Sequence, residues 1–88
     1  MESNLDKEFN RAFQLISELE EGLAPDTMLK LYAYYKQAVS GDIFSFDGEA
    51  DVRNAFKFNA WTQLNGMSQD EAKQEYINLA REILATKF

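Results

Sequence analysis

The chain has 88 residues, enough for one small domain, and its 15 acidic against 9 basic residues give a net charge of −6. That charge argues against non-specific binding to nucleic acid or to an anionic membrane, while 45% hydrophobic residues exclude a disordered tail. Because cysteine and histidine are both missing, disulfides, thiolate metal sites and the usual general base near neutral pH are excluded.

The N-terminal residues 1–6 carry neither the basic segment nor the apolar segment of a secretory signal. No apolar run along the chain approaches the ~20 residues that span a bilayer. We therefore expect a soluble protein of the cytoplasm.

The first expected helix covers residues 4 to about 20. Its apolar side chains recur at the i, i+3, i+4 spacing of an amphipathic helix: Leu5, Phe9, Ala12, Phe13, Ile16 and Leu19. Ser3 or Asn4 can cap its start, and Gly22 is placed as a residue that follows a helix end.

The second expected helix begins at Pro25, which suits a first turn, and runs to about Ser40, before Gly41. At about 100° per residue, one stripe carries apolar, phenolic and cationic side chains: Met28, Leu29, Tyr32, Tyr35, Lys36 and Val39. This combination suits a ligand that is part hydrocarbon, part aromatic ring and part anion. The alternative is core packing of the apolar members, with the Lys36 ammonium reaching solvent.

Residues 41–50 have no helical period and form the long connection, with a marginal strand-like run at 43–46. The third expected helix covers about 51–65 and ends before Gly66. It is apolar on two sides, with Val52, Phe56 and Ala60 on one and Lys57, Trp61 and Leu64 on the other. Such a helix either lies centrally in a bundle or forms the wall of a pocket. Arg53 lies one turn before Lys57.

Ser68 and Glu71 form a capping box that opens the fourth expected helix, which runs nearly to the C-terminus. Its apolar stripe contains Ala72, Tyr76, Leu79, Ala80 and Ile83. A buried tyrosine hydroxyl needs a partner, and for Tyr76 either a ligand phosphate or a backbone carbonyl is suitable. These segments predict one all-α domain over residues 1–88, a four-helix bundle with its longer crossover between the second and third helices.

Metal binding and catalysis have little support in the sequence. Asp47, Glu49 and Asp51 alternate in the long connection, but they do not fit the spacing of a calcium-binding EF-hand loop. The chain has no Gly-rich phosphate loop and no Ser/His or Cys/His pair. We expect no enzyme, no metal and no cofactor.

Three segments, in this order and spacing, resemble the acyl-CoA-binding protein family. They read Leu-Tyr-Ala-Tyr-Tyr-Lys-Gln-Ala-Val-Ser-Gly-Asp-Ile at 31–43, Lys-Phe-Asn-Ala-Trp-Thr-Gln-Leu-Asn-Gly at 57–66, and Ser-Gln-Asp-Glu-Ala at 68–72, followed by Tyr76 and Ile77. The combination is specific, and the resemblance spans the whole chain.

The resemblance implies an up-down-down-up bundle that binds one medium- to long-chain acyl-CoA and serves as an intracellular acyl-CoA carrier and pool former. It also implies the ligand contacts. Tyr32, Lys36 and Lys57 would hold the phosphorylated ribose, and Tyr35 would stack on adenine. Tyr76 would donate to the head group, while Met28 and Leu29 would line the path of the acyl chain.

The chemistry of these side chains agrees with the implied ligand, a fatty acyl-CoA. Lysines and phenols form charge-assisted bonds to phosphate, and apolar surface takes the tail at ~0.8 kcal/mol per buried methylene. We expect a monomer without a nucleic-acid partner, in transient contact with enzymes that use acyl-CoA. The rival hypothesis is a small helical protein-interaction module whose Tyr-rich groove accepts a partner helix.

The chain departs from the family pattern at several positions. Ser17 stands where the family usually has a basic residue, Phe58 replaces a tryptophan, and Asn59 replaces an aspartate. Together with the acidic residues 47, 49 and 51, these changes predict weaker or more salt-sensitive binding of the same ligand class. Tyr34 should project away from the site tyrosines and be exposed.

Overall fold

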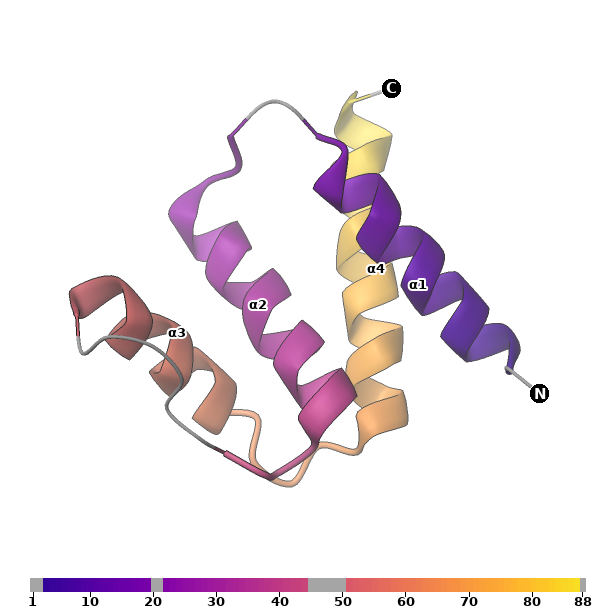
Figure 1. Ribbon diagram of the computed structural model, residues 1–88. Coiled ribbons are helices and arrows are strands. Elements are labelled where there is room, and N and C mark those ends of the chain that lie inside the picture. The colour runs from indigo at the N-terminus through magenta and orange to yellow at the C-terminus, as the bar shows by residue number, and fades with distance from the viewer. Residues whose placement is uncertain (1–2, 20–21, 45–50, 88) are drawn as a thin grey trace.

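The computed structural model describes residues 3–19, 22–44 and 51–87. These ranges contain four helices and no strand: α1 (Asn4–Ser17), α2 (Pro25–Ser40), α3 (Val52–Thr62) and α4 (Gln69–Lys87). α1 and α4 run in one direction, and α2 and α3 run in the other (Figure 1). The predicted all-α, up-down-down-up bundle is confirmed.

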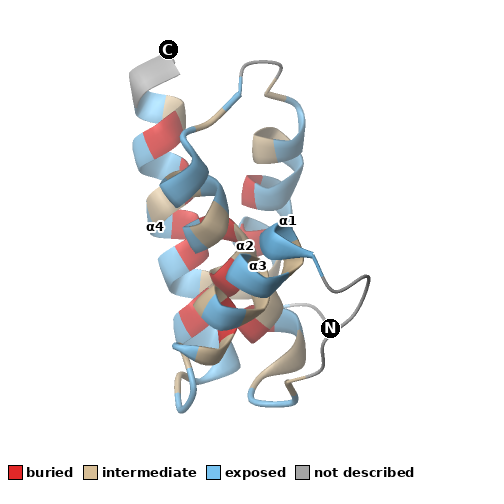
Figure 2. Ribbon diagram, turned by 90° about the vertical axis from the view of Figure 1, so that its left-hand side faces the viewer, coloured by how far each residue is buried: buried red, intermediate tan, exposed pale blue. Residues whose placement is uncertain are grey.

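The helices pack in the order α1, α4, α2, α3. α4 contacts both α1 and α2, whereas α3 packs against α2. Figure 2 shows the buried positions gathered along α4 and between the helices. The core cluster consists of Phe9, Ala12, Leu31, Ala38, Ala72, Tyr76, Ile77, Ala80 and Ile83. α3 contributes a single buried residue, Trp61, so most of its apolar surface stays outside this core.

α1 begins where the sequence predicted, because the Ser3 hydroxyl accepts the backbone N–H of Asp6 at 3.1 Å. It ends at Ser17, three residues short of the predicted end. The Ser17 hydroxyl donates to the Gln14 carbonyl at 2.7 Å and so competes with continued helical bonding. The role predicted for Gly22 is wrong, since Glu18 is the C-cap and Gly22 does not have a positive φ.

Both predicted ends of α2 are confirmed. Pro25 occupies its first turn, and Gly41 caps its end with a backbone N–H that donates to the Gln37 carbonyl at 2.9 Å. Gly41 has a φ of +62°, which disfavours any residue with a Cβ. A glycine at this position therefore ends the helix sharply.

α3 is shorter than predicted, and its ends are set by polar side chains. The Asp51 carboxylate accepts the Asn54 N–H at 2.8 Å, so this loop acid is the N-cap of α3. At the other end, the Thr62 hydroxyl donates to the Asn59 carbonyl at 3.0 Å. Asp47, Glu49 and half of the strand-like run at 43–46 lie outside the described residues.

The start of α4 agrees with the predicted cap, because the Ser68 hydroxyl accepts the Glu71 N–H at 3.0 Å. Two α2 side chains differ from expectation. The core-packing alternative is wrong for Val39, which is 47% exposed. Tyr34 does lie apart from the site tyrosines, but it is half-buried against the core.

Candidate functional site

α2 and α3 enclose an elongated groove of about 800 Å³. It is lined by Pro25, Met28, Leu29 and Tyr32 from α2 and by Val52, Arg53, Phe56 and Lys57 from α3. Four of the seven predicted site residues therefore share one groove: Met28, Leu29, Tyr32 and Lys57. The two helices run in the same direction, so their N-terminal ends form one end of the groove (Figure 1).

The groove combines apolar and cationic side chains: Arg53 lies at the N-terminal end of α3, next to Val52, and Lys57 follows one turn later. Met28, Val52 and Phe56 are 51%, 71% and 57% exposed. The Lys57 ammonium, on the residue that follows Phe56, lies over the Tyr32 ring, 5.4 Å from its centroid. The groove thus presents a hydrocarbon surface next to a cation and a phenol.

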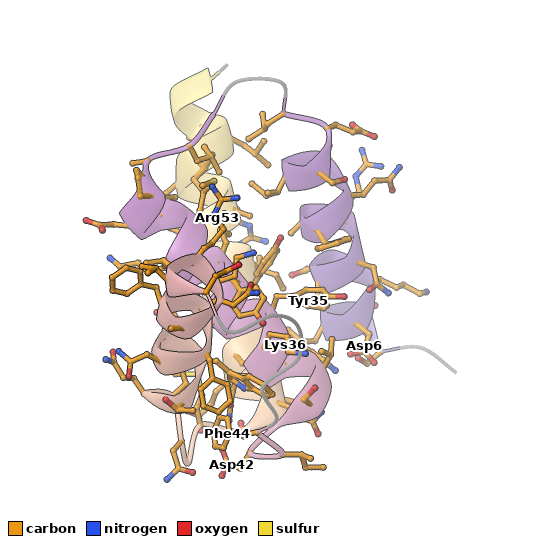
Figure 3. All side chains as sticks on the ribbon, turned by 60° about the vertical axis from the view of Figure 1, so that its left-hand side comes forward. Asp6, Tyr35, Lys36, Asp42, Phe44 and Arg53 are labelled. Atoms are coloured by element: carbon orange, nitrogen blue, oxygen red, sulfur yellow. The ribbon has the colours of Figure 1, made fainter. Side chains whose placement is uncertain are left out.

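A second cavity of about 290 Å³ adjoins the groove at Tyr32, the residue that lines both. Its other lining residues are Phe13, Leu31, Tyr35 and Tyr76. Figure 3 shows Tyr35 directed from α2 toward α1. The structure therefore brings the predicted tyrosines Tyr35 and Tyr76 together, at one side of Tyr32.

Tyr76 is the most deeply placed of the predicted site residues, at 2% exposure. Burial first, and the neighbouring Tyr35 second, raise the pKa of the Tyr76 hydroxyl to about 12. Near neutral pH this hydroxyl is therefore a neutral hydrogen-bond donor. Its ring meets the Phe9 ring edge-on at 5.2 Å.

Lys36 lines neither the groove nor the second cavity. Its ammonium lies over the Trp61 ring, 4.8 Å from the centroid. Lys57 and Trp61 lie one turn apart on α3, on the common face that the sequence predicted, but they meet different neighbours. Lys57 contacts the Tyr32 ring, and Trp61 is 1% exposed and so belongs to the interior.

The fully buried Gln37 explains why Trp61 faces inward. Its Oε1 accepts the indole Nε1–H of Trp61 at 3.0 Å, and its Nε2 donates to Asp42 at 2.8 Å and to the Met67 carbonyl at 2.7 Å. Asp42 also accepts the Gly66 N–H at 3.0 Å. Hydrogen bonds from Gln37, then from Gly66, hold the pKa of the Asp42 carboxyl below its ordinary value.

This network joins the end of α2 to α3 and to the turn before α4. Figure 3 shows Asp42 and Phe44 at the opposite end of α3 from Arg53, and the Phe44 ring lies 4.9 Å from that of Trp61. Part of the conspicuous sequence pattern therefore serves the fold and lies apart from both cavities.

Several groove and cavity residues were missing from the predicted site: Phe13, Pro25, Val52, Arg53 and Phe56. Arg53 was detectable, because it stands one turn from Lys57 on the same helix. Val52 and Phe56 were recognised as an apolar face, yet the sequence left open whether that face was central or a pocket wall. Their exposure shows that they form a wall.

Two of the departures from the family pattern are now placed. The Ser17 hydroxyl is bonded within its own helix. Phe58 packs edge-on against Trp61 at 6.1 Å and so supports the buried side of α3.

In the part of the chain that the structure describes, no group of three or more His, Cys, Asp or Glu residues is placed to hold a metal ion. Within the same residues, no helix is both long and apolar enough to cross a membrane.

Three kinds of comparison with known proteins give the same family. The family model described as "Acyl CoA binding protein" matches residues 6–80. The Acyl-CoA-binding protein of Saccharomyces cerevisiae is 36% identical over 78 residues, which are 88% of this chain and 90% of that protein. The Acyl-CoA-binding protein of Dictyostelium discoideum is 37% identical over 81 residues, 91% of this chain and 95% of that protein.

A solved structure is also similar. The crystal structure of Oryza sativa Acyl-CoA-Binding Protein 2 matches with a TM-score of 0.85 at 27% sequence identity, covering 96% of this chain and 94% of the other.

Proposed function

The chain belongs to the acyl-CoA-binding protein family, and we propose that it binds medium- to long-chain acyl-CoA thioesters as an intracellular carrier and pool former, without catalysis. In this proposal the protein is a cytoplasmic monomer that needs no metal or cofactor. It passes its ligand to acyl-CoA-using enzymes through transient contacts.

The observation that carries the proposal is the composition of the groove between α2 and α3. Exposed apolar side chains are tolerated singly, but three that converge on one groove indicate a surface that an apolar ligand covers. Met28, Val52 and Phe56 are such a set. Each acyl methylene that leaves water here contributes about 0.8 kcal/mol.

The head group is proposed to lie further along the groove, around Tyr32. Lys57 and Tyr32 adjoin one another there, and both present donors suited to a phosphate. Tyr76 supplies a neutral O–H in the adjoining cavity, where Tyr35 supplies an aromatic ring. Lys36 completes the proposed set, and reaching a phosphate requires its ammonium to leave the face of Trp61.

The test is calorimetric titration of the protein with palmitoyl-CoA, octanoyl-CoA, free CoA and palmitate, each below its micelle-forming concentration. We expect one palmitoyl-CoA per chain, bound far more tightly than free CoA, with octanoyl-CoA between them. The proposal is wrong if palmitoyl-CoA binds no more tightly than free CoA, or if neither binds at micromolar protein. The rival hypothesis, a groove for a partner helix, predicts that second outcome.

A further inference from the structure

The turn between α3 and α4 contains the one place in the sequence where glycine follows asparagine, at Asn65 and Gly66. An asparagine side chain can be attacked by the backbone nitrogen of the next residue, and glycine hinders that attack least because it has no side chain. Both residues are exposed. A Cβ built on Gly66 would meet no atom within 4 Å, so neighbouring side chains do not crowd this glycine.

The reaction that these two residues favour is a deamidation, which needs only water as a co-reactant. The Gly66 backbone nitrogen loses its proton to solvent and attacks the Cγ carbon of Asn65, which closes a succinimide ring. The bond between Cγ and Nδ2 then breaks, and the nitrogen leaves as ammonia with a proton returned by solvent. Water opens the ring at either carbonyl carbon, which leaves an aspartate or an isoaspartate at position 65.

The fold holds the attacking nitrogen through a carboxylate of the loop after α2. The Gly66 N–H donates to both carboxylate oxygens of Asp42, at 3.0 and 3.2 Å. A nitrogen bonded in this way is a poor nucleophile, because loss of its proton would place two negative charges side by side. Asp42 lies 24 positions earlier in the chain, so the unfolded protein lacks this bond.

The turn itself also opposes ring closure. It lies beside the end of α2 (Figure 1), and two backbone bonds hold its shape. The Asn65 N–H donates to the Thr62 carbonyl at 3.2 Å, and the Met67 N–H donates to the Leu64 carbonyl at 2.9 Å. The backbone must rotate about Asn65 before the Gly66 nitrogen reaches Cγ, so the rate of deamidation depends on local opening of the turn.

We propose that Asn65 is a modification site, where the chain deamidates through a succinimide with Gly66, and that Asp42 restrains this reaction in the folded protein. The inference is independent of the proposed function. Either product adds a negative charge next to the residue that Asp42 binds, and isoaspartate also inserts one carbon into the backbone before Gly66. Because Asp42 accepts from Gln37, which in turn accepts from Trp61, deamidation should loosen the attachment of α3.

The experiment incubates the folded protein at pH 8 and measures deamidation at position 65 by peptide mapping and mass spectrometry. A synthetic peptide of residues 58–73 serves as the unrestrained reference. The folded protein should react at least about 10-fold more slowly than the peptide. Asp42→Ala should react roughly 10- to 100-fold faster than the parent chain, the factor that corresponds to one hydrogen bond to a charged group.

Two variants are controls. Asp6→Ala removes another carboxylate that accepts a side-chain bond, from Lys73, and it should react as slowly as the parent chain. Asn65→Gln should abolish the reaction at this position, because the longer side chain cannot form the same ring.

The inference is overturned if Asp42→Ala reacts no faster than the parent chain, or if the folded parent reacts as fast as the peptide. If circular dichroism shows that Asp42→Ala has lost helix, amide hydrogen exchange of Gly66 in the parent chain takes its place. The Gly66 N–H should exchange more slowly in the folded protein than in the peptide. Equal exchange would show that Asp42 does not restrain this nitrogen.

Discussion

Three consecutive residues of α2 serve three different purposes. Tyr35 stacks with Phe13 of α1, Lys36 lies over Trp61, and Gln37 is buried in a hydrogen-bond network. Successive side chains on a helix point about 100° apart, so neighbours in the sequence meet different surroundings. A contiguous motif can thus combine proposed ligand contacts with residues that hold the fold.

Lys36 and Lys57 are both proposed to bind phosphate, but replacing each one separately should affect the stability of the fold differently. Lys57→Ala should weaken palmitoyl-CoA binding by about 1.5–3 kcal/mol, the value of a hydrogen bond to a charged group, and leave the fold intact. Lys36→Ala should weaken binding similarly and also lower the free energy of unfolding by about 0.5–1 kcal/mol, because its cation–π contact with Trp61 is lost. Calorimetry gives the first quantity and urea denaturation the second.

Lys30→Ala is the control for this pair. Lys30 is exposed on the same helix, but it lines a different hollow, with Tyr34 and Ala33. Its removal should leave the affinity unchanged. Unchanged affinity in both Lys36→Ala and Lys57→Ala would refute the assignment of these lysines to the site.

At the scale of single residues, the sequence located side chains better than it judged their burial. It selected Met28, Leu29, Tyr32 and Lys57, which do share a groove. It left the burial of Trp61 open, because the burial of that indole depends on Gln37, a residue of another helix. Helical periodicity shows which residues share a face, but it cannot show what covers that face.

At the scale of the helices, the boundaries predicted from proline and glycine agree with the structure. The C-terminal ends predicted from the apolar pattern lie too far along the chain. α2 begins at Pro25 and ends before Gly41, as predicted from backbone preferences alone. α1 and α3 are each about three residues shorter at their C-terminal ends than their apolar pattern indicated, because Ser17 and Thr62 donate to carbonyls of their own helices. Such side-chain bonds give no periodic signal in the sequence.

α3 is the element whose position depends most on polar contacts. Since it buries only Trp61, the bonds of Gln37 to Trp61, Asp42 and Met67 should fix α3 and the following turn against α2. Gln37→Leu keeps similar volume but leaves the indole N–H and the Met67 carbonyl without this partner. We expect the free energy of unfolding to fall by about 2–4 kcal/mol, measured by urea denaturation, as for buried polar groups left unpaired.

The surface variant Gln74→Leu is the control, because Gln74 is exposed and bonds to Asn78 within α4. Its effect should stay within about 0.5 kcal/mol. If Gln37→Leu lowers the free energy of unfolding by no more than this control does, the buried network does not hold α3. The affinity for palmitoyl-CoA should fall with Gln37→Leu, since α3 forms one wall of the groove.

For the whole molecule, the core and the groove lie in different parts of the bundle. The core follows α4, whereas the groove lies between α2 and α3, at the far side from α1. The sequence supplied the helices and their faces, but their packing order is a long-range property that periodicity does not encode. The separation lets groove residues stay exposed without weakening the core.

From its titratable groups, we expect the free energy of unfolding to be constant over a broad pH range and to fall at both acid and alkaline pH. A hydrogen bond from Lys73 lowers the pKa of Asp6, and one from Gln37 lowers that of Asp42. As the pH falls, these carboxylates bind protons at a higher pH in the unfolded chain than in the folded protein. The free energy of unfolding should therefore fall as pH drops below about 4 through the folded pKa values. The chain has no histidine to change this between about pH 5 and 8.

The alkaline loss should come in part from Tyr76, whose pKa burial raises from 10.0 to about 12. Above pH 10 the unfolded phenol ionises while the folded one stays neutral, so the stabilising contribution is complete below pH 10 and lost as pH rises toward 12. The effect should reach about 1–2 kcal/mol. Urea denaturation at pH 8 and pH 11 measures it, and Tyr76→Phe should lose less stability between these values than the parent chain. An equal loss in Tyr76→Phe and the parent chain would contradict the role of Tyr76.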